Sequence, residues 1–207
     1  MDATNCDFSP MKQQLTEGIR QITNELQHSL DILDNDNYCL LSKLEEVKDQ
    51  FIKMESVAAS FYLNCYLAAF TGKYVDLAIC VKRLSDRKHG ALIVVQRRDP
   101  LDSFIQKGTD IGATLTPALL EAIFYPGNPL HDGAVMICGN QIVSAANVLP
   151  LTPAVISRKK LGTRHRAALG LTEISDALVL VVSEETGRVS FALDGKLHPI
   201  ITAQSLH

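Results

Sequence analysis

The sequence predicts an α/β fold with a mixed central β-sheet flanked by helices, preceded by an N-terminal α-helical hairpin. Short continuous apolar runs such as Ala91-Leu92-Ile93-Val94-Val95 suit buried strands, and they alternate with helical patterns and tight turns. The start of the chain instead carries apolar residues at helical spacing. We therefore expect a helical hairpin over residues 1–55 and an α/β domain over residues 56–207.

The N-terminal segment carries two apolar stripes whose members are spaced by three and four residues. The polar run Asp34-Asn35-Asp36-Asn37 separates them and predicts a loop between two antiparallel helices. Such a hairpin cannot bury both stripes alone, so it packs either on the rest of the chain or on another copy. The stripes are Leu15, Ile19, Ile22, Leu26, Leu30 and Leu33, then Leu41, Leu44, Val47, Phe51, Met54 and Ala58.

The rest of the chain mixes helices, strands and hairpins. Ser56 to Thr71 is apolar nearly all round and predicts a buried helix that ends at Gly72. Thr163 is a plausible N-cap for a later helix. Further helices are expected at residues 74–86, 118–124 and 164–174, and strands at 91–95, 134–138, 141–148, 177–182, 188–193 and 197–201.

Composition excludes several classes of protein. The net charge of -3 gives no basic field for nucleic acid. The polar, acidic N-terminus is not a signal peptide, and no apolar run reaches the roughly 18 residues of a membrane span. The five cysteines are scattered without a C-x-x-C pair, so we predict neither a zinc site nor a disulfide framework and expect a cytoplasmic protein.

Gly162-Thr163-Arg164-His165-Arg166 places three cation-capable side chains at an expected helix start. The helix dipole disfavours basic residues there, so their presence indicates a bound anion such as phosphate. Arginine forks and free helix N–H groups would be its donors. The alternative is a solvated basic patch, and the neighbouring Arg158-Lys159-Lys160 is open to the same two interpretations.

His131-Asp132-Gly133-Ala134 stands between a proline-stiffened loop and a buried strand. Taken alone, Asp132 is a turn cap more readily than a metal ligand, and His131 an ordinary loop histidine. Ser183-Glu184-Glu185-Thr186-Gly187 follows another apolar strand, where one glutamate could face a site or both could form an acidic turn.

Together these segments offer carboxylates for a divalent cation and a basic cradle for phosphates, which suits nucleotide phosphoryl chemistry. The P-loop and Rossmann glycine signatures are missing from the sequence. An HD-type phosphohydrolase is disfavoured, because it needs an all-helical core and His131-Asp132 abuts a strand.

At these residues the chain resembles the diadenylate cyclase domain, the DisA N-terminal family. The resemblance rests on Asp132-Gly133-Ala134 and Arg164-His165-Arg166, and it covers about residues 73–195. Flanking segments that also resemble the family are Gly90-Ala91-Leu92-Ile93-Val94, Leu130-His131, Leu149-Pro150-Leu151 and Ser183-Glu184-Glu185-Thr186-Gly187. The helical N-terminus resembles the short sporulation-type members.

The resemblance implies condensation of two ATP into cyclic di-AMP, with release of two pyrophosphates, where two subunits face each other. It implies Mg²⁺ or Mn²⁺ held by Asp132, with His131 and Glu185 as co-ligands. It assigns catalysis to Asp132, Arg164, His165 and Arg166, and ATP binding to Gly133, Ala134, Leu149, Thr163, Arg164, His165 and Arg166.

Residues 1–55 lie outside the resemblance, and we expect them to set the homo-oligomer and to restrain or support activity. A non-catalytic nucleotide sensor with the same fold is the alternative function. Such a binder would be expected to lose Asp132 or the arginines, and both are present. A purely structural helical assembly would leave the two motifs unexplained.

Overall fold

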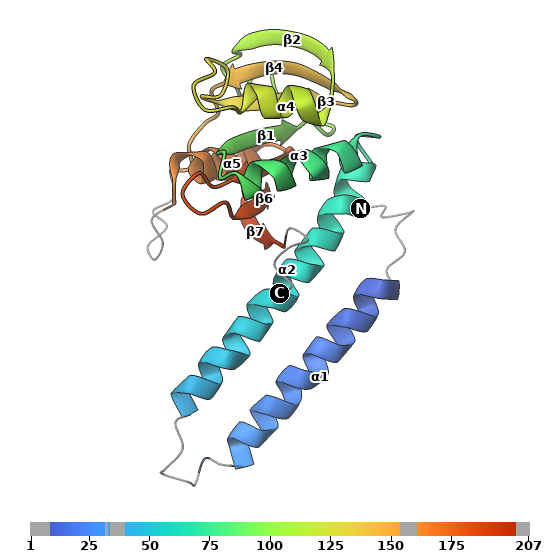
Figure 1. Cartoon of the computed structure of the whole chain (residues 1–207), viewed down its shortest axis with the longest axis vertical. Helices are drawn as coiled ribbons and strands as arrows, with labels where there is room; N and C mark the ends of the chain where they lie inside the picture. Colours follow the sequence, from blue (N-terminus) through green and yellow to red (C-terminus); the bar gives the residue numbers. More distant parts are fainter. Residues whose placement is uncertain (1–8, 32, 34–39, 154–160, 202–207) are drawn as a thin grey trace. The chain divides into compact units, whose positions relative to one another are not determined.

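A computed structural model of the chain describes residues 9–31, 33, 40–153 and 161–201 (Figure 1). It contains two compact units, Met1–Cys65 and Tyr66–His207. The boundary expected after residue 55 lies inside a helix that continues to Ala68. Within the described residues, no helix combines the length and the apolar character that crossing a membrane requires.

The N-terminal unit is built from α1 (Ser9–Asp31) and most of α2 (Leu40–Ala68). Two contacts fix their antiparallel pairing, because Gly18 lies against Met54 while Glu25, further along α1, accepts a hydrogen bond from Gln50, earlier in α2. The predicted hairpin is thus confirmed. The loop expected at Asp34-Asn35-Asp36-Asn37 lies outside the described residues. The helical patterns expected at 41–58 and 56–71 form one continuous helix.

The hairpin leaves much of its apolar surface exposed. Ile22 is buried, as are Ala59 and Leu63 of α2. Seven members of the predicted stripes are exposed and others are partly buried, because two helices can cover only one strip of each other. These exposed residues are Ile19, Leu26, Leu30 and Leu33, followed by Leu41, Leu44 and Phe51.

The C-terminal unit is organised around a seven-stranded sheet of order β2-β4-β3-β1-β5-β6-β7 (Figure 1). Only the β1–β3 pair is parallel, and the other neighbours are antiparallel. The strands are β1 (Ala91–Val95), β2 (Thr109–Thr114), β3 (Ala134–Cys138), β4 (Gln141–Asn147), β5 (Leu178–Val182), β6 (Val189–Leu193) and β7 (Lys196–Ile200).

Strand β2 is the one strand that the sequence analysis missed. It lies at the sheet edge, is largely exposed, and contains a register shift beside Gly112, whose φ is +62°. A polar edge strand lacks the apolar run that predicts a buried strand. The mixed sheet with flanking helices is otherwise confirmed.

Helix α5 (Thr163–Ile174) covers one face of the sheet, where alternate residues of β1, β3 and β5 join one apolar cluster with Ala167, Ala168 and Leu171. The intervening strand residues are also buried and point to the opposite face. On that face α3 (Tyr74–Asp86) packs against α4 (Pro117–Ile123) and contacts β5. Both faces are therefore covered, which explains the continuous apolar strands.

The cysteines differ from one another. Cys65 is disulfide-bonded, which the sequence analysis did not predict. Cys80 and Cys138 are free thiols. Burial raises the pKa of the Cys80 thiol to about 12, so this residue acts as a small apolar side chain rather than as a nucleophile.

Candidate functional site

A cleft of about 1340 Å³ opens on the C-terminal unit. It lies between the turn before β3, the segment after β4, the start of α5 and the loop after β5. These are the chain segments that carry the motifs singled out in the sequence. Polar residues of the lining are His131, Asp132, Asn147, Thr163, Arg164, His165, Ser183, Glu184, Glu185 and Thr186.

The turn before β3 is held by Asn128. Its side chain accepts a hydrogen bond from the Leu130 N–H and donates one to the Ala122 carbonyl. The backbone carbonyl of Asn128 accepts a hydrogen bond from the His131 N–H and also contacts His131 Nδ1. Because a carbonyl only accepts, Nδ1 carries a proton, and in the neutral ring Nε2 keeps its lone pair for another partner.

Gly133 is required by the backbone itself. Its φ is +122°, and a Cβ there would lie 2.8 Å from the Asn147 carbonyl oxygen and from the Ala146 carbonyl carbon. This close approach to β4 explains why position 133 is a glycine, apart from the ATP-binding role that the resemblance implies for it. Asp132, one residue earlier, is exposed at the cleft. No described residue makes a hydrogen bond or ion pair with its carboxylate, which is therefore open to a ligand.

Helix α5 begins one residue earlier than predicted. Gly162 is the N-cap and Thr163 the first helical residue, so the expectation of Thr163 as N-cap is wrong. Gly162 offers no side chain, and no acidic residue lies in the first turn. The first N–H groups of the helix thus receive no side-chain cap, at a point where Gly162, Thr163 and Arg164 line the cleft.

Arg164 is held across the cleft by Glu184. Its Nη1 atom donates to Glu184 Oε2 at 2.8 Å. A Cβ on Gly90 would lie 2.8 Å from Arg164 Cζ and 2.9 Å from Glu184 Cβ, so any larger residue at this position would displace the pair. The bond from Arg164 holds the pKa of the Glu184 carboxyl below its usual range, and His131 adds to this effect. Glu184 is therefore ionised and committed to Arg164.

His165 is half-buried, and burial lowers the pKa of its imidazole. It is therefore neutral at pH 7, with one nitrogen donating and the other accepting. In this form it can donate a hydrogen bond to an anion without adding a full charge to the helix start.

The segment after β4 is clamped against α5. The Thr152 N–H donates to the Arg166 carbonyl and its hydroxyl donates to Glu173. A Cβ on Gly170 would collide with the Pro150 carbonyl oxygen, so the helix approaches this segment closely because Gly170 has no side chain. This packing fixes Leu149 at the cleft.

Most of the predicted site residues meet in this cleft. Ala134 is fully buried and Arg166 is exposed, and neither lines the cleft. Arg158-Lys159-Lys160 lies outside the described residues. Site roles for Gly90, Asn147 and Gly170 were not predictable from the sequence, because an isolated glycine or strand-end asparagine gives no periodic signal. The predicted residues in the lining are His131, Asp132, Gly133, Leu149, Thr163, Arg164, His165 and Glu185.

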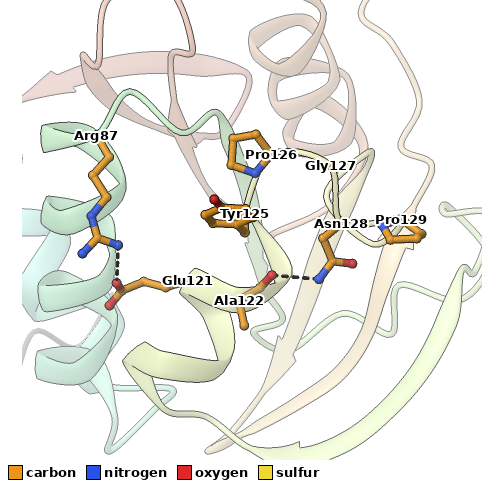
Figure 2. Close-up of a pocket in the computed structure, with 8 residues that line it drawn as sticks. All are labelled: Arg87, Glu121, Ala122, Tyr125, Pro126, Gly127, Asn128 and Pro129. Atoms are coloured by element: carbon orange, nitrogen blue, oxygen red, sulfur yellow. Dashed lines mark hydrogen bonds and ion pairs between the residues drawn. The ribbon is translucent and has the colours of Figure 1, made fainter.

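A second hollow of about 750 Å³ lies beside α3 and α4 (Figure 2). Its polar groups largely satisfy one another, because Arg87 pairs with Glu121 and the Asn128 amide donates to the Ala122 carbonyl. Its other walls are the exposed Tyr125 and two prolines. This hollow lacks the combination of free carboxylate, basic helix start and imidazole, so the first cleft is the better candidate site.

Comparisons with known proteins show the family to which the chain belongs. Residues 78–197 match the family described as "DisA bacterial checkpoint controller nucleotide-binding", and residues 3–70 match "Diadenylate cyclase CdaS, N-terminal". The chain is 50% identical over 187 residues to the cyclic di-AMP synthase CdaS of Bacillus subtilis, covering 90% of each protein. It is 50% identical over 190 residues to the diadenylate cyclase CdaS of Bacillus thuringiensis, covering 92% of this chain and 94% of that one.

Solved structures give the same relationship. A Bacillus cereus protein described as a hypothetical membrane spanning protein superposes with a TM-score of 0.76 at 49% identity, covering 93% of this chain and 95% of that one. A double mutant of DacA from Staphylococcus aureus superposes with a TM-score of 0.59 at 42% identity, covering 61% and 85%. The chain therefore belongs to the DisA nucleotide-binding (DAC) family of diadenylate cyclases, with the N-terminal region of its CdaS members.

Proposed function

We propose that this protein is a diadenylate cyclase that condenses two ATP molecules into cyclic di-AMP and releases two pyrophosphates. The observation that carries the proposal is the cleft, which brings the Asp132 turn and the Arg164-His165 helix start together. Its volume of about 1340 Å³ is large enough for a nucleoside triphosphate. Relatives named for this activity are 50% identical over nearly the whole chain.

The triphosphate would bind at the start of α5. Free helix N–H groups, the Arg164 guanidinium and neutral His165 offer donors to phosphate oxygens. Arg166 lies in the same helical turn with an exposed side chain, and we propose that it contacts the outer phosphates. As pyrophosphate leaves, these donors would stabilise the charge that develops on it. Leu149 would present its backbone to adenine.

Mg²⁺ or Mn²⁺ would be held by Asp132, with His131 and Glu185 at the same cleft. The described residues contain no ready-made cluster of three metal-ligating side chains. His131, Asp132 and Glu185 are therefore not gathered into one ligand set, and the cation would have to complete its shell with substrate phosphates and water, as Mg²⁺ usually does. The contact of His131 Nδ1 with Asn128 leaves Nε2 as the ligand atom. When bound, the metal would lower the pKa of the attacking hydroxyl.

Each cleft would hold one ATP, so two copies must face each other for the reaction. The 3′-oxygen of one ATP forms a bond to the α-phosphorus of the other. The bond from that phosphorus to the pyrophosphate breaks, and the hydroxyl proton is released. The second ATP repeats these steps in the opposite direction and closes the ring.

We propose that the N-terminal hairpin assembles copies of the chain and thereby decides whether clefts meet. Its support is the exposed apolar surface of α1 and α2, which includes Leu30 and Leu41 at 60% and 68% exposure. Deletion of residues 1–55 should change both the mass in light scattering and the cyclase rate. Unchanged values of both would refute this part of the proposal. We further propose that the protein acts in the cytoplasm, without nucleic-acid or membrane partners.

The test of the proposed activity is incubation with ATP and Mn²⁺ or Mg²⁺, followed by chromatography for cyclic di-AMP and pyrophosphate. A cyclase yields one cyclic di-AMP for each two pyrophosphates. A nucleotide sensor would bind ATP and give no product with either metal, at concentrations where the protein is assembled and where it is not.

A further inference from the structure

Asn147, the last residue of β4, is a polar side chain that is 1% exposed and borders the cleft. Its amide joins three segments of the chain. Nδ2 donates to the Ala134 carbonyl at 2.8 Å, and Oδ1 accepts from the Gly108 N–H at 3.0 Å and from the Ser144 hydroxyl at 2.9 Å. Buried amides are costly unless paired, so this network specifies how the segments meet.

The β3–β4 ladder is irregular where Asn147 lies. The register shifts between Ala134 and Met136, and Ala146 has a φ of +56°. A bulge of this kind interrupts regular strand pairing. The Asn147 side chain supplies a hydrogen bond to the Ala134 carbonyl beside this irregularity. Ala134 opens β3 directly after the Asp132-Gly133 turn.

Two glycines show how tightly this end of β4 is enclosed. A Cβ on Gly133 would lie 2.8 Å from the Asn147 carbonyl oxygen, and a Cβ on Gly108 would collide with the Ala145 carbonyl oxygen. The backbone beside Asp132 therefore rests directly on β4. Since no described residue holds the Asp132 carboxylate, its position depends on this backbone contact after Asp132 and on the Asn128 contacts to Leu130 and His131 before it.

We infer that Asn147 is a positioning residue, which holds the Asp132 turn against β4 and so sets where Asp132 meets the metal. The inference rests on the proposed function, in which Asp132 is a metal ligand. The Val148 side of the cleft has separate anchors, because Val148 pairs with Gln106 through two backbone hydrogen bonds of 2.9 Å. Loss of Asn147 should therefore affect the metal more than the nucleotide.

The experiment compares Asn147→Ala with Ser144→Ala in the full chain. Ser144 is fully buried and bonds the same Oδ1 atom, yet its loss leaves the bond to Ala134 in place. Mn²⁺ binding is measured by electron paramagnetic resonance with a non-reactive ATP analogue, and ATP binding by calorimetry in EDTA. For Asn147→Ala we expect the Mn²⁺ dissociation constant to rise about 10-fold or more, as when groups that orient metal ligands are removed.

The affinity of Asn147→Ala for ATP without metal should stay within about 2-fold of wild type. Ser144→Ala should bind Mn²⁺ within about 2-fold of wild type, because metal affinity falls only when the support of a metal ligand is disturbed. Equal Mn²⁺ shifts in both variants, or none in Asn147→Ala, would overturn the inference. If Asn147→Ala does not fold, Asn147→Leu is used in its place, because leucine has the same number and branching of side-chain heavy atoms but forms no hydrogen bonds. Failure of both to fold would make Asn147 a folding residue instead. A wild type that binds Mn²⁺ without forming cyclic di-AMP would refute the cyclase proposal alone.

Discussion

The two units of the chain differ in how far they bury their apolar residues. In the C-terminal unit β1 and β5 are buried along their whole length, and the sheet is covered on both faces. In the N-terminal unit large apolar residues such as Ile19, Leu30 and Phe51 are more than half exposed. One unit completes its own core and can present a shaped cleft, whereas the other leaves a surface that another copy could cover.

This difference separates the two tasks that a cyclase of this kind needs. Chemistry requires side chains held within fractions of an ångström, and in the C-terminal unit we propose this role for the close glycine contacts and the Asn147 network. The proposed assembly requires only a broad complementary surface, such as the exposed apolar residues of α1 and α2. Substitutions in the cleft should therefore lower turnover without changing assembly, whereas substitutions in the hairpin should change assembly and alter turnover only through it.

The largest effect is expected from Asp132→Asn in the C-terminal unit. The change removes the negative charge of the proposed metal ligand, so cyclic di-AMP formation should fall more than about 100-fold, beyond the loss from disturbing a group that merely orients a ligand. Asp132 is exposed, so the melting temperature should not change. Steady-state assays and thermal melting measure the two quantities. Activity near that of wild type would remove Asp132 from the mechanism.

In the N-terminal unit, Leu30→Glu should weaken assembly without unfolding the hairpin. Leu30 is 60% exposed, so its loss should change the stability of the single chain by less than about 0.5 kcal/mol. If another copy covers it, lost burial of about 1.5–3 kcal/mol corresponds to roughly 10- to 100-fold weaker association. Analytical ultracentrifugation over a concentration series measures this. Thr23→Glu is the control, because it adds the same charge at an exposed position of the same helix without removing an apolar residue. Dissociation by this variant as well would mean that charge alone disrupts the assembly.

Back in the cleft, Gly90→Ala should weaken ATP binding by about 10-fold, the value of a lost charge-assisted hydrogen bond. The added Cβ would displace the Arg164 guanidinium from Glu184. Gly72→Ala is the matched control, since its nearest neighbour would lie 3.4 Å away, at Asn140. Calorimetry with ATP in EDTA gives both affinities. Equal affinities in the two variants would show that the position of Arg164 against Glu184 does not matter for nucleotide binding.

The sequence predicted those parts of the molecule that follow a repeating pattern. The apolar runs of β1 and β3 and the helical spacing of α3 gave bounds that the structure confirms. The polar edge strand β2 was missed because exposed residues are under no pressure to alternate. Gly162 was missed as N-cap because Thr163 offers the commoner capping side chain.

The site was predictable where residues act through their own charge, as for Asp132 and Arg164. Positions that act by close approach were not, because only the fold shows what their neighbours are. Gly90 lies beneath Arg164, and Gly170 lies against the segment that carries Leu149. Asn147 joins segments nearly forty positions apart, from Gly108 to its own strand, and no local pattern encodes that contact.

The smallest effect should come from Glu184→Gln, which breaks the ion pair with Arg164 while keeping the shape of the side chain. Because Arg164 lowers the pKa of Glu184, the pair stabilises the fold above the ordinary glutamate pKa of 4.5, and this contribution is lost as pH falls through the lowered value. The Glu184 side chain is 66% exposed, so solvent screens the pair and its contribution at pH 7 should be below about 1 kcal/mol. Urea unfolding should show the variant slightly less stable at pH 7 and equal to wild type well below pH 4.5. A difference that persists at low pH would mean that Glu184 stabilises the loop through its shape and not its charge.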